Sequence, residues 1–253
     1  MKKVIFCCVL FSIVSCKSSN DKKIPNMEGT YFMSTQILNN GIKDTKYTDL
    51  KQLKMYTGSF YMYAQVNPSD SSSAFGVGSY STNHDSGTVT ETVIYRASDS
   101  IFQNDPTQYV LNVTLTSDGY QQIIPEIQMD SAKYKLTEDY QKTGDSTKTP
   151  MDGVWKETRS VVIKGADTSV NQRVQYKAYY GGYFMFGQYV KGTDSKHHTG
   201  IGFGTFKMKS DTELEETDLN STYSVIAGHT FGVKIGMDGP DKYHQTILNV
   251  DGT

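Results

Sequence analysis

The chain has 253 residues, of which 37% are hydrophobic and 12% aromatic, and a formal net charge of −2 at pH 7. This length allows one large or two modest domains, each able to bury a core. Arg occurs only at positions 96, 159 and 173 and Lys is scattered, so the charge pattern argues against a nucleic-acid-binding surface. The 18 Tyr and 11 Phe favour strands and bury much area per residue, and we therefore expect an all-β fold.

The N-terminus has the pattern of a bacterial lipoprotein signal peptide. Lysines at positions 2 and 3 precede the apolar run VIFCCVLFSIV at 4–14, which is shorter than the roughly 20 residues that span a bilayer. Ile13–Cys16 (IVSC) resembles a lipobox, in which the peptide is cut before a Cys that then receives fatty-acid chains such as palmitate. The alternative is an ordinary secretory signal with an incidental Cys.

This pattern predicts a place in the bacterial cell envelope. A signal peptide would cover residues 1–15 and a lipidated tether 16–26, with Cys16 as the lipid anchor to the outer membrane, on its periplasmic or its surface face. The three cysteines, Cys7, Cys8 and Cys16, all lie in this segment. The mature domains would therefore have no internal disulfide, no thiolate metal cluster and no Cys nucleophile.

The rest of the chain contains an internal repeat. Four segments recur in the same order, at offsets between 123 and 126 residues. They are Met27–Tyr31 with Met151–Trp155, Gly58–Gln65 with Gly181–Gln188, Phe75–Tyr80 with Ile201–Phe206, and Tyr120–Ile124 with Tyr243–Ile247. Residues 141–150 are polar and contain Gly, Ser, Thr and Pro, which indicates a linker. The sequence therefore predicts one domain over 27–140 and a second over 151–253.

Each copy shows strand signals. Ser86–Tyr95 alternates in side-chain character, and Tyr109–Thr116 is β-branched and apolar before a turn signal at 117–119. Helical spacing is hard to find, and its best candidate is Tyr47–Lys54. Short strands in a unit of ~100–120 residues predict a small antiparallel barrel or sandwich. Only the first copy continues into a further strand, Ser131–Tyr140, so the second barrel lacks its last strand, borrows one, or continues beyond this sequence.

The pattern inside each copy resembles the lipocalin-like domains of secreted lipoproteins from Gram-negative bacteria. Those domains begin with Gly-x-Trp, as in Gly153–Trp155, and continue with an aromatic strand like Tyr183–Phe186. A Gly-x-Tyr or Gly-x-Phe strand follows, as in Gly78–Tyr80 and Gly204–Phe206, and then a Thr-x-Thr-Glu segment like Thr88–Glu91. The resemblance implies two tandem small antiparallel β-barrels of the lipocalin-like (calycin) type, with apolar interiors.

The aromatic strands YTGSFYMYAQV (Tyr56–Val66) and YYGGYFMFGQYV (Tyr179–Val190) are apolar on both faces. Because alternate side chains of a strand face opposite ways, one face would line a barrel interior and neighbouring elements or a second barrel would cover the other. The interior face is either plain core packing or the wall of a ligand cavity, in which the two glutamines orient a guest. Its residues are Tyr61, Tyr63, Gln65, Phe184, Phe186 and Gln188.

Two carboxylates are further candidates for ligand binding. Glu91 lies on the same side of its segment as Val89 and Val93, and Glu216 is its expected counterpart. If that side faces inward, each barrel holds a buried carboxylate that needs a partner, such as a Tyr hydroxyl or Arg173, or a raised pKa. The alternatives are an outward-facing charge and a purely structural hydrogen-bonding residue.

Catalytic and metal-binding patterns do not occur in the sequence. His197 and His198 would point to opposite faces of a strand, and there is no Gly-x-Ser-x-Gly, His-Glu-x-x-His or phosphate-binding loop. We therefore expect no enzyme activity, cofactor or metal. The leading hypothesis is a lipid-anchored protein that binds a small apolar or amphipathic ligand. The alternative is a non-catalytic structural protein with side-chain-filled barrels, whose loops contact partner proteins or glycans.

Overall fold

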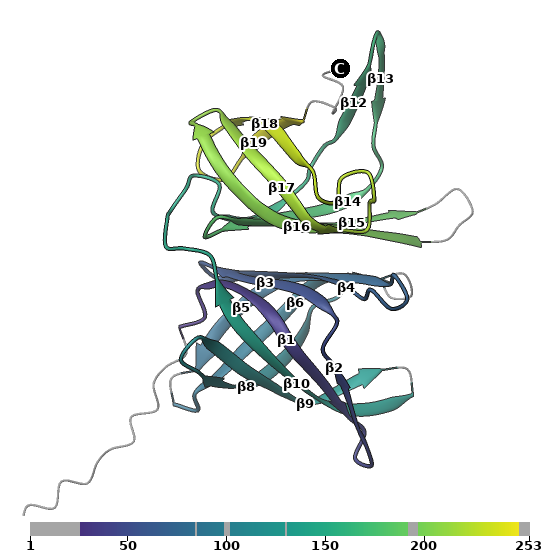
Figure 1. Ribbon diagram of the computed structural model, residues 1–253, viewed down its shortest axis with the longest axis vertical. Coiled ribbons are helices and arrows are strands. Elements are labelled where there is room, and N and C mark those ends of the chain that lie inside the picture. The colour runs from purple at the N-terminus through teal and green to yellow at the C-terminus, as the bar shows by residue number, and fades with distance from the viewer. Residues whose placement is uncertain (1–25, 84, 99–101, 130, 192–196, 248–253) are drawn as a thin grey trace, which may run out of the picture.

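The computed structural model describes residues 26–83, 85–98, 102–129, 131–191 and 197–247. Every helix or strand assigned within these ranges is a β-strand, which confirms the all-β prediction (Figure 1). None of the described residues forms a helix long and apolar enough to cross a bilayer. The predicted signal peptide (1–15), the lipidation site Cys16 and the tether up to residue 25 lie outside the described residues.

The first copy is a closed barrel of eight antiparallel strands, in the order β10-β9-β8-β6-β5-β4-β3-β1, which the pairing of β10 with β1 closes. The barrel strands are β1 (Gly29–Asn39), β3 (Lys51–Thr57), β4 (Phe60–Val66), β5 (Ser73–Asn83), β6 (Thr88–Ser98), β8 (Thr107–Leu115), β9 (Gly119–Met129) and β10 (Ala132–Thr143). Two short strands extend it: β2 (Asp44–Tyr47) pairs with β1, and β7 (Phe102–Gln103) pairs with β6.

The second copy is an open, curled sheet of seven strands, called here the half-barrel, in the order β11-β14-β15-β16-β17-β18-β19. Its strands are β11 (Gly153–Lys156), β14 (Val174–Tyr180), β15 (Tyr183–Lys191), β16 (His197–Ser210), β17 (Glu213–Ser221), β18 (Thr230–Met237) and β19 (Tyr243–Ile247). A separate hairpin, β12 (Val161–Lys164) and β13 (Asp167–Val170), projects beyond it (Figure 1). The described part of the second copy contains no counterpart of β10.

The two copies share their strand register as well as their sequence. Tyr63 pairs with Gly76 in the closed barrel, and Phe186 pairs with Gly202 in the half-barrel. Each following strand pair has a bulge at the same place, just before Gly78 and just before Gly204. The repeated segments therefore occupy equivalent positions in two similarly built sheets.

A local signal explains the hairpin that joins β14 to β15. Gly181 and Gly182 form its two-residue turn, with φ of +60° and +78°. Two successive positive φ angles define the turn that matches the twist of antiparallel strands, and Gly adopts them at little cost. The pair of glycines therefore fixes the register of the aromatic strand β15.

The barrels pack against each other through the outward faces of their aromatic strands (Figure 1). Strands β3 to β6 contribute one half of this apolar layer and β14 to β16 the other. Its most buried members include Met62 and Phe75 from the closed barrel and Met185 and Phe203 from the half-barrel. This packing explains why the aromatic strands are apolar on both sides, because one face lines a barrel and the other lines the interface.

Two details of the sequence interpretation change. Tyr47–Lys54 is not helical; it contains the end of β2 and the start of β3, which pairs with β1 and β4 and is buried from Gln52 to Thr57. Strand β10 extends to Thr143, beyond the boundary drawn at residue 140, because residues 139–143 pair with both β1 and β9 or with β1 alone.

Candidate functional site

Each copy buries a Lys, a Glu and a Tyr in contact. In the closed barrel, the Lys54 Nζ atom lies 2.7 Å from Glu91 Oε1, and the Tyr56 hydroxyl donates a hydrogen bond to the same carboxylate. In the half-barrel, Lys177 Nζ lies 2.6 and 2.8 Å from the two oxygens of Glu216. The Tyr179 hydroxyl donates to Glu216 in the same way. Glu91 and Glu216 therefore do face inward, and each is neutralised by a lysine from a more distant strand of the same sheet.

Burial and the adjacent carboxylate raise the pKa of both tyrosines. Tyr56 lies beside Glu91 and Tyr179 beside Glu216, and removal from water is the larger cause of each raised pKa. A tyrosinate there would face a carboxylate in a poorly solvated interior. Both hydroxyls therefore remain protonated donors to their Glu over the physiological pH range.

Side chains from β10 complete the interior of the closed barrel. Gln52 donates a hydrogen bond to the Tyr140 hydroxyl, which itself donates to Glu138 Oε2 at 2.9 Å. Gln122 Nε2 also donates to Glu138 Oε2, at 2.6 Å. The Tyr120 ring stacks on the Tyr140 ring with centroids 4.8 Å apart. Tyr140 and Glu138 thus occupy the space between the two glutamines.

The half-barrel has a pocket where β10 side chains would lie. Its volume is about 400 Å³, within the range of small-molecule sites. Gln175 and Gln245, the counterparts of Gln52 and Gln122, both line it. The other lining residues are Arg173, Lys177, Phe186, Gln188, Glu216, Asp218, Tyr223, Val225, Ile226, Phe231 and Ile247. Among the described residues no strand fills this position in the second copy, so the pocket is open where the first copy is filled.

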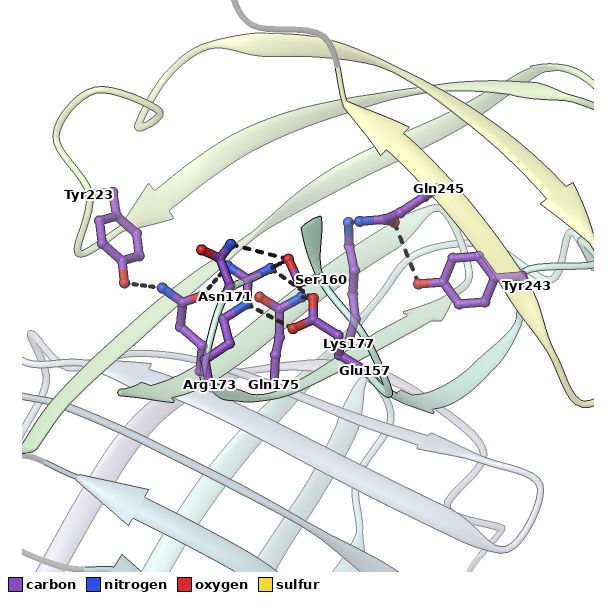
Figure 2. Close-up of polar contacts among 10 residues, drawn as sticks. Glu157, Ser160, Asn171, Arg173, Gln175, Lys177, Tyr223, Tyr243 and Gln245 are labelled. Atoms are coloured by element: carbon purple, nitrogen blue, oxygen red, sulfur yellow. Dashed lines mark hydrogen bonds and ion pairs between the residues drawn. The ribbon is translucent and has the colours of Figure 1, made fainter. Parts of the chain in front are cut away.

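One side of the pocket is a hydrogen-bonded polar network, shown in Figure 2. Arg173 donates to Glu157 Oε1 and Oε2 at 2.8 and 2.7 Å, and to Gln188 Oε1 at 3.0 Å. Gln175 Nε2 donates to Glu157 Oε2 at 3.3 Å, and Gln188 donates to the Tyr223 hydroxyl. A planar guanidinium that is held by a carboxylate on two atoms has little freedom to move, so this wall is rigid.

Other lining residues of the pocket, next to this network, are apolar. Phe186 and Tyr223 lie nearly parallel, with ring centroids 6.4 Å apart. Val225 and Ile226 come from the turn-rich segment between β17 and β18, and Val225 is 75% exposed. An aliphatic side chain so exposed at a pocket mouth offers apolar area that a guest would cover.

Asp218 is a second buried carboxylate, found in the half-barrel only. It follows Glu216 on the inward face of β17 and is 3% exposed. Its burial, and then the negative charge of Glu216, raise the pKa of Asp218 to about 7, while Lys177 opposes this shift. The corresponding position in the closed barrel is Val93, because both residues face the glycine of the strand bulge, Gly78 or Gly204.

The eight predicted ligand-binding residues fall into three groups. Phe186, Gln188 and Glu216 line the pocket of the half-barrel. Phe184 is fully packed in the apolar core of the same unit. The four predicted residues of the closed barrel, Tyr61, Tyr63, Gln65 and Glu91, contribute to its filled interior.

Sequence reasoning missed the lysines and the second carboxylate. Lys54 and Lys177 occupy the same place in the repeat, each inside an otherwise apolar strand, and that recurrence was the available signal. Arg173, suggested as a partner of a buried Glu, binds Glu157 instead, which lies 16 residues earlier in the chain. Asp218 lies two residues after Glu216, so strand alternation puts the two carboxylates on one face, and that was the available signal.

Comparison of the chain with models of protein families, with curated proteins and with solved structures gave no match. The class of protein therefore follows from the fold and the site alone. It is an all-β protein, composed of a filled, closed antiparallel barrel and a half-barrel with an open, mixed polar and apolar pocket.

Proposed function

We propose that this protein binds a small amphipathic ligand in the pocket of its half-barrel, and that the closed barrel is the rigid base on which this unit folds. The pocket volume of about 400 Å³ beside a preformed polar network is the observation that carries the proposal. An apolar wall with few, fixed polar groups is the usual composition of a small-molecule site. The protein would act by binding, without catalysis.

The location of this function is part of the proposal. The IVSC lipobox at 13–16 supports acylation at Cys16 and anchorage in the bacterial envelope, with the domains held at the outer membrane as a lipocalin-like lipoprotein. A pocket with both apolar and polar walls suits ligands that partition between a membrane and water.

Native purification tests the proposal. The full chain, extracted from membranes with detergent, is examined by intact and native mass spectrometry. We expect a mass for the cut and acylated chain, and a non-covalently bound small molecule. No bound molecule, together with no thermal stabilisation by any member of a metabolite and lipid library, would contradict ligand binding.

A matched pair of variants assigns the ligand to the pocket. Phe231→Ala removes apolar area from the pocket wall, whereas Phe60→Ala removes a ring that is 45% exposed on the closed barrel. We expect the thermal shift caused by the ligand to fall strongly in Phe231→Ala and to persist in Phe60→Ala. Equal shifts in both variants would place the ligand elsewhere.

A second candidate function is contact with a protein partner, and the β12–β13 hairpin favours it. Val162, Ile163 and Val170 are exposed by 45%, 68% and 53% on a hairpin whose strands pair only with each other. Exposed apolar groups on an isolated hairpin suit an interaction surface. A co-purifying protein that Ile163→Ser loses, with no small molecule in the mass spectrum, would favour this second function.

A further inference from the structure

Asp218 has a buried oxygen with nothing to bind. The side chain lines the pocket, and its Oδ1 atom has no hydrogen-bond partner among the residues that the structure describes. Gly202 leaves the room for it, since a Cβ at that glycine would lie 2.8 Å from Asp218 Oδ1 and 2.3 Å from the Phe186 ring. A buried carboxylate without a partner costs free energy, so such a group needs a reason to be kept.

Asp218 is a charged residue of the pocket that has no ion-pair partner among the described residues. Arg173 is paired with Glu157 and Lys177 with Glu216, and each pair sums to zero. In the described parts of the chain no ion pair reaches Asp218, although it lies on the same wall as Glu216. The pocket therefore has one uncompensated acidic group, which attracts a cation and repels an anion.

The closed barrel shows that the fold does not need this carboxylate. Val93 occupies the equivalent place there, opposite the bulge glycine Gly78, and is 5% exposed. The acidic residue thus occurs in the copy that has an open pocket, and an apolar residue occurs in the copy that is filled. This contrast links Asp218 to the contents of the pocket and not to the stability of the sheet.

We propose that the half-barrel selects an amphipathic amine, whose protonated amino group donates hydrogen bonds to Asp218 while its apolar part lies against Phe186 and Phe231. This inference rests on the ligand-binding function proposed above and names the class of ligand. An ammonium supplies up to three donors and one positive charge, which satisfies the unpaired oxygen and balances the pocket. A carboxylate ligand would bring a second negative charge beside Asp218, which no ion pair compensates in the described parts of the chain.

Three matched series of probes test the choice of head group. Each series has one apolar body, n-octyl, phenylethyl or indolylethyl, and carries an amine, a hydroxyl or a carboxylate. Isothermal titration calorimetry on the full chain is expected to show at least one amine binding roughly tenfold to a hundredfold more tightly than its alcohol and its acid. Alcohols or acids that bind as well as every amine would overturn the inference and leave the ligand-binding function standing.

Variants then test the residue. Asp218→Asn keeps the shape and loses the charge, and Asp218→Val introduces the residue of the closed barrel. Both are expected to abolish the preference for the amine, while Asp218→Asn retains the weaker affinity for the alcohol. Glu215→Gln is the control, since Glu215 lies on the same strand with a side chain that is 42% exposed.

Unchanged amine affinity in Asp218→Asn, or no binding of any probe to the wild-type chain, would also overturn the inference. In the second case the native mass spectra decide the broader function separately.

Discussion

At the scale of single residues, Asp218 lowers the free energy of unfolding by an amount that depends on pH. The pKa of this carboxyl is raised from its ordinary value of 3.8 to about 7, by burial and by Glu216. A group whose pKa is higher in the folded state binds its proton more tightly there, so the folded state gains from protonation. The free energy of unfolding therefore falls as the pH rises from about 4 to about 7, and it stays lower above that.

Asp218→Val is expected to remove this dependence. Relative to the wild type, the free energy of unfolding of Asp218→Val should contain a pH-dependent gain of about 4 kcal/mol at pH 8. This gain should vanish near pH 4. Urea denaturation of wild type and variant across this range measures it. Glu215→Gln changes an exposed carboxylate and should leave the pH profile as it is. A difference between Asp218→Val and wild type that does not vary with pH would contradict the raised pKa.

The two buried lysines test the difference between a filled and an open interior. Lys54→Met leaves Glu91 buried without its ion-pair partner, which should cost about 3–5 kcal/mol of unfolding free energy. Lys177→Met leaves Glu216 beside a pocket that water can enter, so the loss should be smaller by about 1 kcal/mol or more. Chemical denaturation compares them. Equal losses in the two barrels would show that Glu216 is as dry as Glu91.

Adding Glu91→Gln to Lys54→Met supplies the control for this comparison. The double variant removes the stranded charge, so most of the loss caused by Lys54→Met should be recovered. No recovery would mean that Lys54 acts through packing against Tyr56, whose ring centroid lies 5.2 Å from its Nζ atom.

At the scale of strands, the sequence predicted the features that follow from side-chain alternation and from the internal repeat. Alternation placed Glu91 on the same side as two valines and left open whether that side faces inward; the structure has it inside the barrel. The repeat placed Gly58–Gln65 and Gly181–Gln188 in equivalent surroundings, which their registers confirm. The extra segment at 131–140 forms β10 and closes one barrel, and the second unit remains open in the described residues.

The sequence did not show which side chains from distant strands contact each other. A single Lys in an apolar strand usually indicates an exposed position, so Lys54 and Lys177 were not recognised as partners of Glu91 and Glu216. Glu138 and Tyr140 of β10 fill the matching space of the first copy, and the sequence alone does not show that these two side chains point there. The closed barrel is filled where a cavity was one of the two interpretations.

At the scale of the whole molecule, the two barrels share one apolar layer and should unfold together. Thr30 Oγ1 donates to the Tyr180 carbonyl oxygen at 2.9 Å, and Ser73 Oγ donates to the Thr199 carbonyl oxygen at 3.1 Å, so hydrogen bonds flank the layer. A large, dry interface between domains couples their stabilities, whereas a small polar one does not. The half-barrel, whose edge strands β11 and β19 have one neighbour each among the described strands, would then depend on the closed barrel for its stability.

Gly187 tests this coupling because it lies directly against a side chain of the closed barrel. It lies on the interface face of β15, and a Cβ at this position would be 2.2 Å from Cγ of Phe75, a fully buried ring of the closed barrel. Val suits a strand, so Gly187→Val should leave β15 itself intact and push the two barrels apart. Overpacking of this kind costs about 1–3 kcal/mol.

Differential scanning calorimetry is expected to show one transition for the wild type and two for Gly187→Val, with the half-barrel melting first. Gly232→Val is the matched control, because a Cβ at Gly232 in β18 would have no heavy atom within 4 Å outside its chain neighbours. That variant should keep the single transition. If Gly187→Val also melts in one step at the wild-type temperature, the barrels are held together by something other than the packing of Phe75 against β15.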